Sequence, residues 1–398
     1  MPGVKSMKLK NFFHICLIFL IGGQFVRLSR GEFNFYLSDL MLVLFTVVGF
    51  IYLLVKKSLK INIPLIFFSL FGVVALISLL FNIESYNFNQ ILISSSYLVR
   101  FIAILGTVIV LTNLVYLGEL TSDELIEIII SYILAFCLMG FIQYIILPDF
   151  TVLDSSLGWD PHKYRLASTF FDPNYAGSFL VLGIAALAYK FDKNKNISVL
   201  DFVALISILS GVLITYSRSA WLMLSALVFV LGFKYKTIML LSILIFFGAY
   251  IAVPRIQTRL TGTTDPADSA QFRLISWRKA LDVFVANPVL GVGFNAFRYS
   301  QESVLVDYSD AKKINSGAGS DSSFLLVLAT TGVIGFAMFI VAYLFPIIWS
   351  NGNIFVFGIT IALALNTQFI NSLFYPQILL VFLLLIQVFS NQSSSRKL

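Results

Sequence analysis

Arginines and an aspartate stand where polar segments of this chain meet apolar runs, and these residue types can do chemistry. Arg218 lies in TYSRSAW between two apolar runs, Arg273 opens RLISWRKAL, and Asp321 directly precedes the apolar run from Ser322. A guanidinium at such a junction can hold an anion, because its planar fork pairs with phosphate oxygens and keeps its charge. A neighbouring carboxylate can serve as a general base. The set predicts displacement of a phosphate leaving group.

Further residues near these junctions are candidates for binding the anion or the group attached to it. Arg165 opens RLASTFFDPNYAG, whose Asp-Pro-Asn turn also predicts a helix start, since Asp and Asn cap helices and Pro fixes φ. Arg100 stands inside the apolar run SSSYLVRFIAIL, where a charge requires a partner or an aqueous cavity. The further binding candidates are Arg165, Asp172, Asn174, Arg278, Tyr216 and Arg100.

Each candidate also has a purely structural interpretation. Arg218 could extend its side chain to lipid phosphate at a tight hairpin. Asp321 could only cap the helix that follows it, which would stabilise that helix by about 1 kcal/mol. Arg100 could belong to an ion pair inside the bundle, and the Asp-Pro-Asn turn could simply start the next helix. The sequence leaves these alternatives open.

The composition indicates that these residues belong to a membrane protein. Of 398 residues, 59% are hydrophobic and 12% are charged, and the mean hydropathy is +0.91, whereas soluble domains carry about 25% charged residues. Spanning helices are favoured because a helix satisfies its own backbone polar groups in lipid. We therefore expect an all-α fold, with residues 1–398 forming one polytopic membrane domain of about twelve transmembrane helices.

The positions of the apolar runs and of the basic loops predict a topology. The runs lie near 11–26, 38–55, 62–81, 91–116, 125–146, 175–190, 198–216, 219–233, 237–253, 322–348, 354–371 and 374–390. Lysines and arginines gather at both termini and in alternate short loops, such as those at Lys56, Lys190 and Lys234. Basic loops face the cytoplasm, which predicts two cytoplasmic termini. The acidic loop 117–124 is a weak exception.

This topology places two long segments outside the membrane, 147–174 and 254–321. Long loops in a compact bundle are uncommon unless they are functional, so the outer face is the expected working face. Leu274, Trp277, Leu281 and Phe284 follow helical spacing, which predicts an interfacial amphipathic helix near 272–287 that Pro288 ends. We expect the polar residues of 299–320 to line a substrate groove; these include Tyr299, Glu302, Asp307, Tyr308, Asp310, Lys312 and Lys313.

Several classes of site are not indicated by the sequence. Cys16 and Cys137 both lie in apolar runs, and the two histidines, His14 and His162, are far apart, so we expect no metal site. The chain has no Gly-rich phosphate loop and no basic tract of the nucleic-acid kind. We therefore expect no cofactor and no nucleic-acid partner.

The ordered motifs resemble those of the O-antigen polymerase and O-antigen ligase superfamily of polytopic membrane glycosyltransferases. The motifs are TFFDPNYAG, TYSRSAW, RLISWRKAL followed by NPVLGVGFNAF, and SDSSFLLVLATTGVIG, which together cover residues 165–345. The resemblance implies that the substrates are oligosaccharides linked to undecaprenyl pyrophosphate, at the outer face of the bacterial cytoplasmic membrane. It also implies membrane lipids and a chain-length regulator protein as partners, and a reaction that uses no metal.

The resemblance assigns roles to particular residues. It makes Arg218 and Arg273 the pyrophosphate-binding arginines, with Arg165 as a further arginine of the outer loops. It aligns the ligase's proposed catalytic His with Asp321, so this chain departs from the ligase motif there, which favours a polymerase. In the resulting hypothesis Asp321 orients or deprotonates an acceptor hydroxyl, the transfer is inverting, and the nearby arginines keep Asp321 ionised.

Three other functions fit parts of the sequence. A ligase would differ from a polymerase only in its acceptor. A peptidoglycan polymerase would use the same lipid carrier, but its own signatures are not recognisable in this chain. A transporter or flippase would show many spans and buried arginines, yet transporters place ionisable residues near the membrane midplane, whereas these charges gather in outer segments.

Overall fold

Every predicted apolar run forms a helix in the computed structural model, which describes residues 9–30, 33–153, 162–193, 198–261, 269–304 and 319–395. Their helices are α1 (Leu9–Gly22), α2 (Leu37–Val55), α3 (Ile63–Phe81), α4 (Phe88–Tyr116), α5 (Ser122–Ile146), α6 (Pro173–Lys193), α7 (Val199–Ile214), α8 (Arg218–Gly232), α9 (Lys236–Ala252), α13 (Ser323–Trp349), α14 (Ile354–Asn366) and α15 (Pro376–Ser395). The all-α prediction is confirmed, apart from a short antiparallel hairpin of β1 (Arg27–Arg30) and β2 (Phe33–Tyr36).

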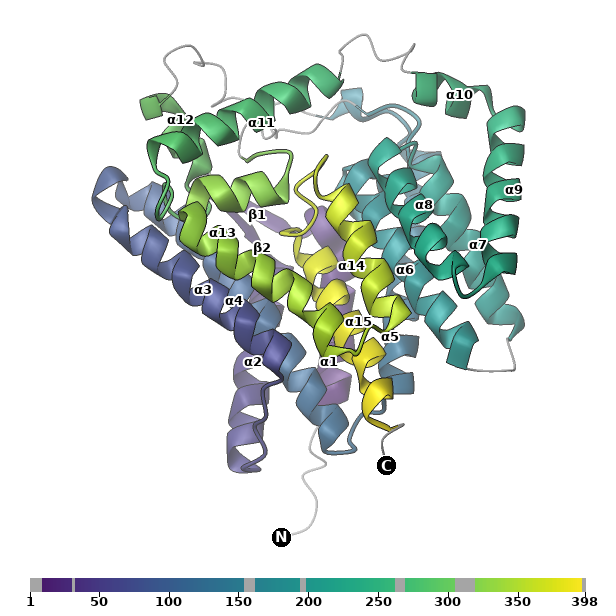
Figure 1. The fold of residues 1–398 in the computed structure, drawn as a ribbon, viewed down its shortest axis with the longest axis horizontal. Helices are drawn as coiled ribbons and strands as arrows, with labels where there is room; N and C mark the ends of the chain where they lie inside the picture. Colours follow the sequence, from purple (N-terminus) through teal and green to yellow (C-terminus); the bar gives the residue numbers. More distant parts are fainter. Residues whose placement is uncertain are drawn as a thin grey trace.

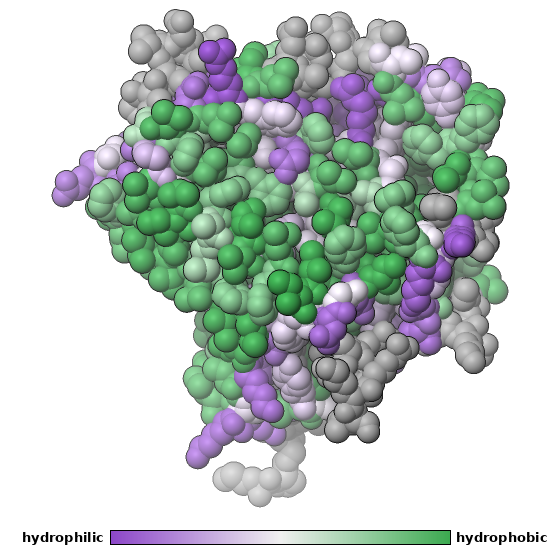
Figure 2. Space-filling view, viewed as in Figure 1, coloured by the Kyte–Doolittle hydropathy of each residue, from purple (hydrophilic) through white to green (hydrophobic). Residues whose placement is uncertain are grey.

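The helices and the surface are those of a membrane protein. Within the described residues, α2, α3, α4, α5 and α13 are each long and apolar enough to cross a membrane, and shorter apolar helices accompany them. Figure 2 shows hydrophobic side chains over the middle of one face and hydrophilic side chains towards its two ends. Such a band is what a bilayer requires of the protein surface that it contacts.

Both termini lie at one end of the molecule, and α10 (Pro254–Thr261), α11 (Ser269–Ala286) and α12 (Phe297–Val304) lie at the other (Figure 1). The lysine-rich loops share the end that holds the termini. The acidic loop 117–124 lies there too, since Lys10 pairs with Glu124 at 2.5 Å and Lys193 pairs with Asp123. Its carboxylates therefore neutralise the neighbouring basic loops.

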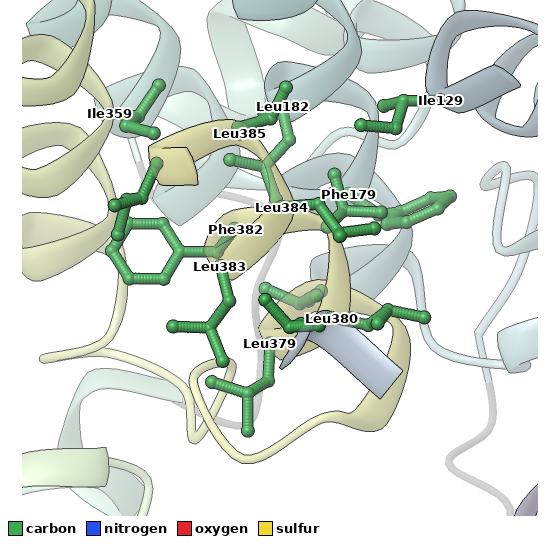
Figure 3. Packing of buried hydrophobic residues seen from close by; sticks show 14 of the residues in the cluster. Ile129, Phe179, Leu182, Ile359, Leu379, Leu380, Phe382, Leu383, Leu384 and Leu385 are labelled. Carbon is green, nitrogen blue, oxygen red and sulfur yellow. The ribbon is translucent and has the colours of Figure 1, made fainter. Parts of the chain in front are cut away.

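The last helix forms the centre of the bundle. From Ile378 to Phe389 nearly every side chain of α15 is buried, and Figure 3 shows its leucines packed against Phe179 and Leu182 of α6 and Ile129 of α5. A helix that is apolar all round must be enclosed by other elements. This explains why the span near the C-terminus contributes core and no site residue.

The helix α13 is broken, although the sequence predicts one continuous span. Gly332 has φ +64° and ψ −167°, a conformation outside the helical region. The segment 288–293 crosses at the break, where Val292 N donates to Ala329 O at 3.1 Å and Gly293 N donates to Thr330 O at 3.0 Å. Val333 N donates back to Pro288 O at 2.8 Å. Backbone groups that a break would leave unpaired are thus satisfied by a second backbone.

Only glycine fits on either side of this crossing. A Cβ on Gly332 would lie 2.3 Å from the carbonyl of Val289, and one on Gly291 would lie 2.4 Å from the carbonyl carbon of Thr330. The α3 helix supports the crossing, because the hydroxyl of Ser78 donates to Leu290 O at 2.6 Å and lies 2.7 Å from Thr330 O. The Gly-rich turn noted in the sequence is therefore a close approach of two main chains.

A helix is present where the sequence predicts one, as α11, and its place in the membrane interface stays a prediction. Ala280 and Val283 are the buried residues of this helix, whereas Leu274, Leu281 and Val285 are exposed. Small side chains allow α11 to lie close to α13, and several of its larger apolar side chains are exposed at the protein surface.

We predict that Gly332→Ala destabilises the protein by more than about 3 kcal/mol, because it adds a steric clash to an unfavourable φ. Gly352→Ala is the matched control, since Gly352 has φ +69° and no heavy atom near the added Cβ; it should cost about 1 kcal/mol. Thermal melting in detergent measures both changes. Equal losses in the two variants would show that the crossing tolerates a side chain.

Candidate active site

The first half of the site is a hydrogen-bonded unit built around Arg165. Its Nε donates to Thr215 O at 2.8 Å, and its NH2 donates to Asn174 Oδ1 at 3.2 Å and to Tyr216 O at 3.3 Å. Asn174 begins α6, where its backbone N donates to Asp172 Oδ1 at 2.7 Å. The Asp-Pro-Asn turn is therefore a helix cap, as predicted, and it also presents Asn174 to the arginine.

The hairpin between α7 and α8 places Arg218 beside this unit. Tyr216 has φ +49°, and the backbone of Ser217 leads directly into α8, of which Arg218 is the first residue. The hydroxyl of Ser217 is 2.8 Å from Asn174 Oδ1. Two separate motifs of the sequence thus meet at one place, the one that holds Arg165 and Asn174 and the one that holds Tyr216–Arg218.

Arg255 of α10 ties the first outer loop to the same hairpin, and the sequence did not single it out. Its guanidinium donates to Tyr164 O at 2.6 Å and to Lys163 O at 2.5 Å, and it lies 4.4 Å from the centre of the Tyr216 ring. An arginine suits this position because its planar group can donate from its edge while its face stacks on an aromatic ring. The sequence feature that could have identified Arg255 is the segment VPRIQTR, which directly follows an apolar run.

The second half of the site joins α11 to the start of α13. The backbone N of Asp321 donates to the hydroxyl of Ser276 at 2.9 Å. Arg273 precedes Ser276 by three residues, which places both on one face of α11. Ser322 then caps α13 by accepting from Leu325 N at 3.4 Å. Since Ser322 is the cap, Asp321 lies one residue before it and is held instead by α11.

The electrostatic surroundings of Asp321 differ from those expected. Burial raises the pKa of Asp321 from 3.8 to about 6, the Arg273 charge opposes that rise, and the Asp172 charge adds to it. The predicted effect of arginine is thus present, but desolvation outweighs it. Asp321 is consequently a group that titrates near neutral pH, which suits proton transfer. Asp172 belongs to the first half of the site and Asp321 to the second, so the two halves interact electrostatically.

His162 is a further member of the site that the sequence analysis set aside. Its Nδ1 lies 3.4 Å from NH1 of Arg165. Burial lowers the pKa of His162 to about 4, with Asp172 opposing the shift and Arg165 and Arg259 reinforcing it. The imidazole is therefore neutral, and because arginine can only donate, the proton belongs on Nε2. Its position three residues before Arg165, in an outer loop, was the signal that could have found it.

Buried polar side chains connect the two halves. The hydroxyl of Ser178 on α6 donates to Asn366 Oδ1 at 2.9 Å, and the hydroxyl of Ser372 donates to the same oxygen at 2.6 Å. On the other side, Ser323 donates to Asn371 Oδ1 at 2.8 Å and its backbone N to Thr367 O at 3.0 Å. Polar groups buried between helices are stable only when they are paired in this way, so the 366–372 segment fixes α6 relative to α13.

Two predicted binding residues lie outside this cluster. Arg100 is buried and paired with Asp39, with its Nε 2.9 Å from both carboxylate oxygens, and its guanidinium stacks on Tyr36 and Tyr97. This is the structural ion pair that the sequence left open. Arg278 is exposed on α11. Of the expected substrate groove, α12 covers the first part, and 305–318 lie outside the described residues.

Comparison with known proteins agrees with the motifs. A family model described as O-Antigen ligase matches residues 202–340, which include the hairpin, α10, α11 and the break in α13. An O-antigen polymerase of Shigella flexneri is 24% identical over 306 residues, which are 71% of this chain and 71% of that protein. The chain is thus similar to O-antigen ligases and O-antigen polymerases. This similarity and the apolar helices together support an integral membrane protein of polysaccharide biosynthesis.

The superfamily match and the site coincide only in part. Residues 202–340 contain Arg218, Arg255, Arg273 and Asp321, whereas Arg165 and its partners precede them. Among the described residues, no three His, Cys, Asp or Glu side chains come together as a metal site would require. The ionisable groups described at the site are arginines, the carboxylates of Asp172 and Asp321, and the neutral imidazole of His162.

We predict that Arg100→Met destabilises the protein by about 3–5 kcal/mol, because it leaves Asp39 without its countercharge. Adding Asp39→Asn should restore most of the loss, as expected for an ion pair with a structural role. Melting temperatures in detergent measure the cycle, with Arg278→Met as an exposed control that changes little. A double variant as unstable as Arg100→Met would show that the pair is not the source of the stability.

Proposed function

We propose that this chain is a polysaccharide polymerase of the O-antigen type. It would join oligosaccharide repeat units carried on undecaprenyl pyrophosphate, by inverting glycosyl transfer at the outer face of a bacterial cytoplasmic membrane. The observation that carries the proposal is that the charges of Arg273 and Asp172 both act on Asp321, while Asp172 accepts from the backbone of Asn174, whose side chain accepts from Arg165. This arrangement combines an anion clamp with a base, which is the set that the departure of a pyrophosphate requires.

Each side chain has a role in the proposed reaction. Arg218 and Arg273 hold the pyrophosphate of the donor, and Arg165 orders the hairpin and adds positive charge. Asp321 accepts the proton of the acceptor sugar hydroxyl as its oxygen attacks the anomeric carbon. The bond from that carbon to the pyrophosphate oxygen breaks, and undecaprenyl pyrophosphate leaves with the electron pair. The neutral His162 can donate a hydrogen bond without adding a charge that would compete for the anion.

The proposed orientation follows from the positions of charge and apolar surface. The lysine-rich loops and both termini share one end, which the basic-loop rule assigns to the cytoplasm. Segments 147–174 and 254–321 would then be extracytoplasmic, and α11 would lie in the outer interface with its exposed leucines in the lipid. The whole chain would act as a single membrane domain beside a chain-length regulator protein.

A ligase is the second candidate, because the family model that matches residues 202–340 is described as an O-Antigen ligase. A ligase would use the same donor and the same leaving group, and would transfer the glycan to a different acceptor. The transporter alternative gains from the broken α13, since broken helices are common in transporters. In this chain, however, the break is filled by the backbone of 288–293, so it does not line a passage.

We predict that cells lacking this gene accumulate single-repeat glycans, and that the wild-type gene restores a ladder of longer chains. Arg273→Ala should not restore the ladder, because the clamp loses a charge that stabilises the leaving group; losses of about 100-fold or more in turnover are typical of such groups. Lys236→Ala is the matched control, because it also removes a cation but lies at the start of α9, at the end of the bundle that holds the termini. This variant should restore the ladder. Gel analysis of the glycans measures the outcome.

The other glycan profiles have separate meanings. Full-length chains left on the lipid carrier in the deletion strain would indicate a ligase. An unchanged glycan profile would exclude both the polymerase and the ligase and would favour a transporter.

We predict that polymerase activity rises with pH through about 6, the value to which burial raises the pKa of Asp321. Below that pH the carboxyl is protonated and cannot accept the hydroxyl proton; above it the base is available. Asp172→Asn should move the inflection to lower pH by removing a like charge, and Arg273→Gln should move it to higher pH. Rates of chain growth on purified substrate, normalised for each variant, measure the shifts. Full activity of Asp321→Asn would remove the assignment.

A further inference from the structure

An apolar cavity of about 210 Å³ lies between the outer ends of α7, α9 and α10. Its walls are Ser210, Leu213, Ile214, Tyr216, Ala249, Val253 and Ile256. Hydrocarbon and an aromatic ring dominate this lining. None of the residues assigned above to proton transfer or to the anion clamp faces it, so the reaction chemistry does not account for its presence.

The size and lining of the cavity favour an apolar occupant. A cavity of about 150 Å³ with an aliphatic and aromatic lining stays dry and takes up benzene, because water there would lack hydrogen-bond partners. The present cavity has a volume of about 210 Å³ and is open to the surface of the protein, so a longer chain can enter it. It can therefore hold a branched hydrocarbon segment of several carbon atoms. Binding in the cavity would remove the apolar surface of that segment from water.

The cavity and the anion site share a wall. Tyr216 lines the cavity. Its carbonyl also accepts from Arg165, and its ring stacks against the guanidinium of Arg255. Arg218 follows two residues later as the first residue of α8, and Ile256 of the cavity follows Arg255 directly. A molecule with an anionic head among these arginines would have its tail at the mouth of the cavity.

The position of α9 gives such a tail a way out of the protein. This helix stands at the edge of the bundle (Figure 1), and Ile243, Leu244, Phe247 and Ile251 on it are more than half exposed. A helix with so much exposed hydrocarbon packs on one side only. A chain that entered the cavity behind α9 could therefore continue into the surrounding lipid without crossing a polar layer.

We propose that this cavity binds the first isoprene units of the polyprenyl chain of the lipid carrier, next to its pyrophosphate. The proposal rests on the proposed function, since it takes a lipid-linked pyrophosphate as the ligand. The branched, unsaturated units next to the head would be recognised here, while the rest of the chain lies in the bilayer. Cavity and arginines then select a polyprenyl pyrophosphate over inorganic pyrophosphate and over phospholipids with straight chains.

Binding measurements on the purified full chain in detergent test this site without any turnover. Ala249→Phe fills the cavity, and Ala252→Phe makes the same change at an exposed position of α9 that does not line it. We expect Ala249→Phe to weaken binding of undecaprenyl pyrophosphate by about ten-fold, which is about 1.4 kcal/mol. Binding of inorganic pyrophosphate should be unchanged. Ala252→Phe should leave both affinities unchanged.

A second measurement covers the case in which Ala249→Phe does not fold. A short prenyl pyrophosphate that carries a photoreactive group in its first isoprene unit should label wild-type α7, α9 or α10, and excess undecaprenyl pyrophosphate should prevent the labelling. Labelling confined to other helices, equal affinities of the two phenylalanine variants, or equal competition by phosphatidylglycerol would each overturn the proposal.

The result is separable from that of the proposed function. Selective binding that depends on Ala249, in a protein whose deletion leaves the glycan profile unchanged, would keep the lipid site and reject the polymerase. A glycan ladder that depends on this gene, with no effect of Ala249→Phe on binding, would keep the enzyme and reject the cavity.

Discussion

The crossing of two main chains at Gly332 and Gly291 is the constraint on which the site depends. Hydrogen bonds between 288–293 and the broken α13 replace those that a continuous helix would have made. The break gives the first part of α13 its own direction, and Asp321 lies just before that part. The same crossing fixes the chain where it returns from α11, so Asp321 and Arg273 are positioned by one contact of backbone with backbone.

Polar groups within an apolar bundle are costly unless they are paired. Two amides near the site follow this rule with their oxygens: Asn174 Oδ1 accepts from Arg165 and Ser217, and Asn366 Oδ1 accepts from two serines. Arg100 and Asp39 satisfy each other farther along the bundle. Pairing of this kind holds Arg165 in a fixed position, and fixed positions of charged groups are a condition for stabilising developing charge.

Burial and neighbouring charges combine differently at two residues of the site, which gives these residues different chemistry. Asp321 has a raised pKa because desolvation outweighs the nearby arginine, whereas His162 has a lowered pKa because desolvation and arginines act together. Asp172 contributes to both shifts. One environment therefore produces a carboxylate able to take a proton near neutral pH and an imidazole that remains uncharged.

The sequence by itself determined the elements. The lengths of the apolar runs determined the helices, since backbone groups in lipid must pair within a segment. Pro288 and the Asp-Pro-Asn turn marked helix ends. Only the tertiary structure decided the break at Gly332, the partner of Arg100 and the roles of His162 and Arg255 in the site. Each of these depends on a contact between distant segments, and hydropathy and spacing report only the local requirement of the chain.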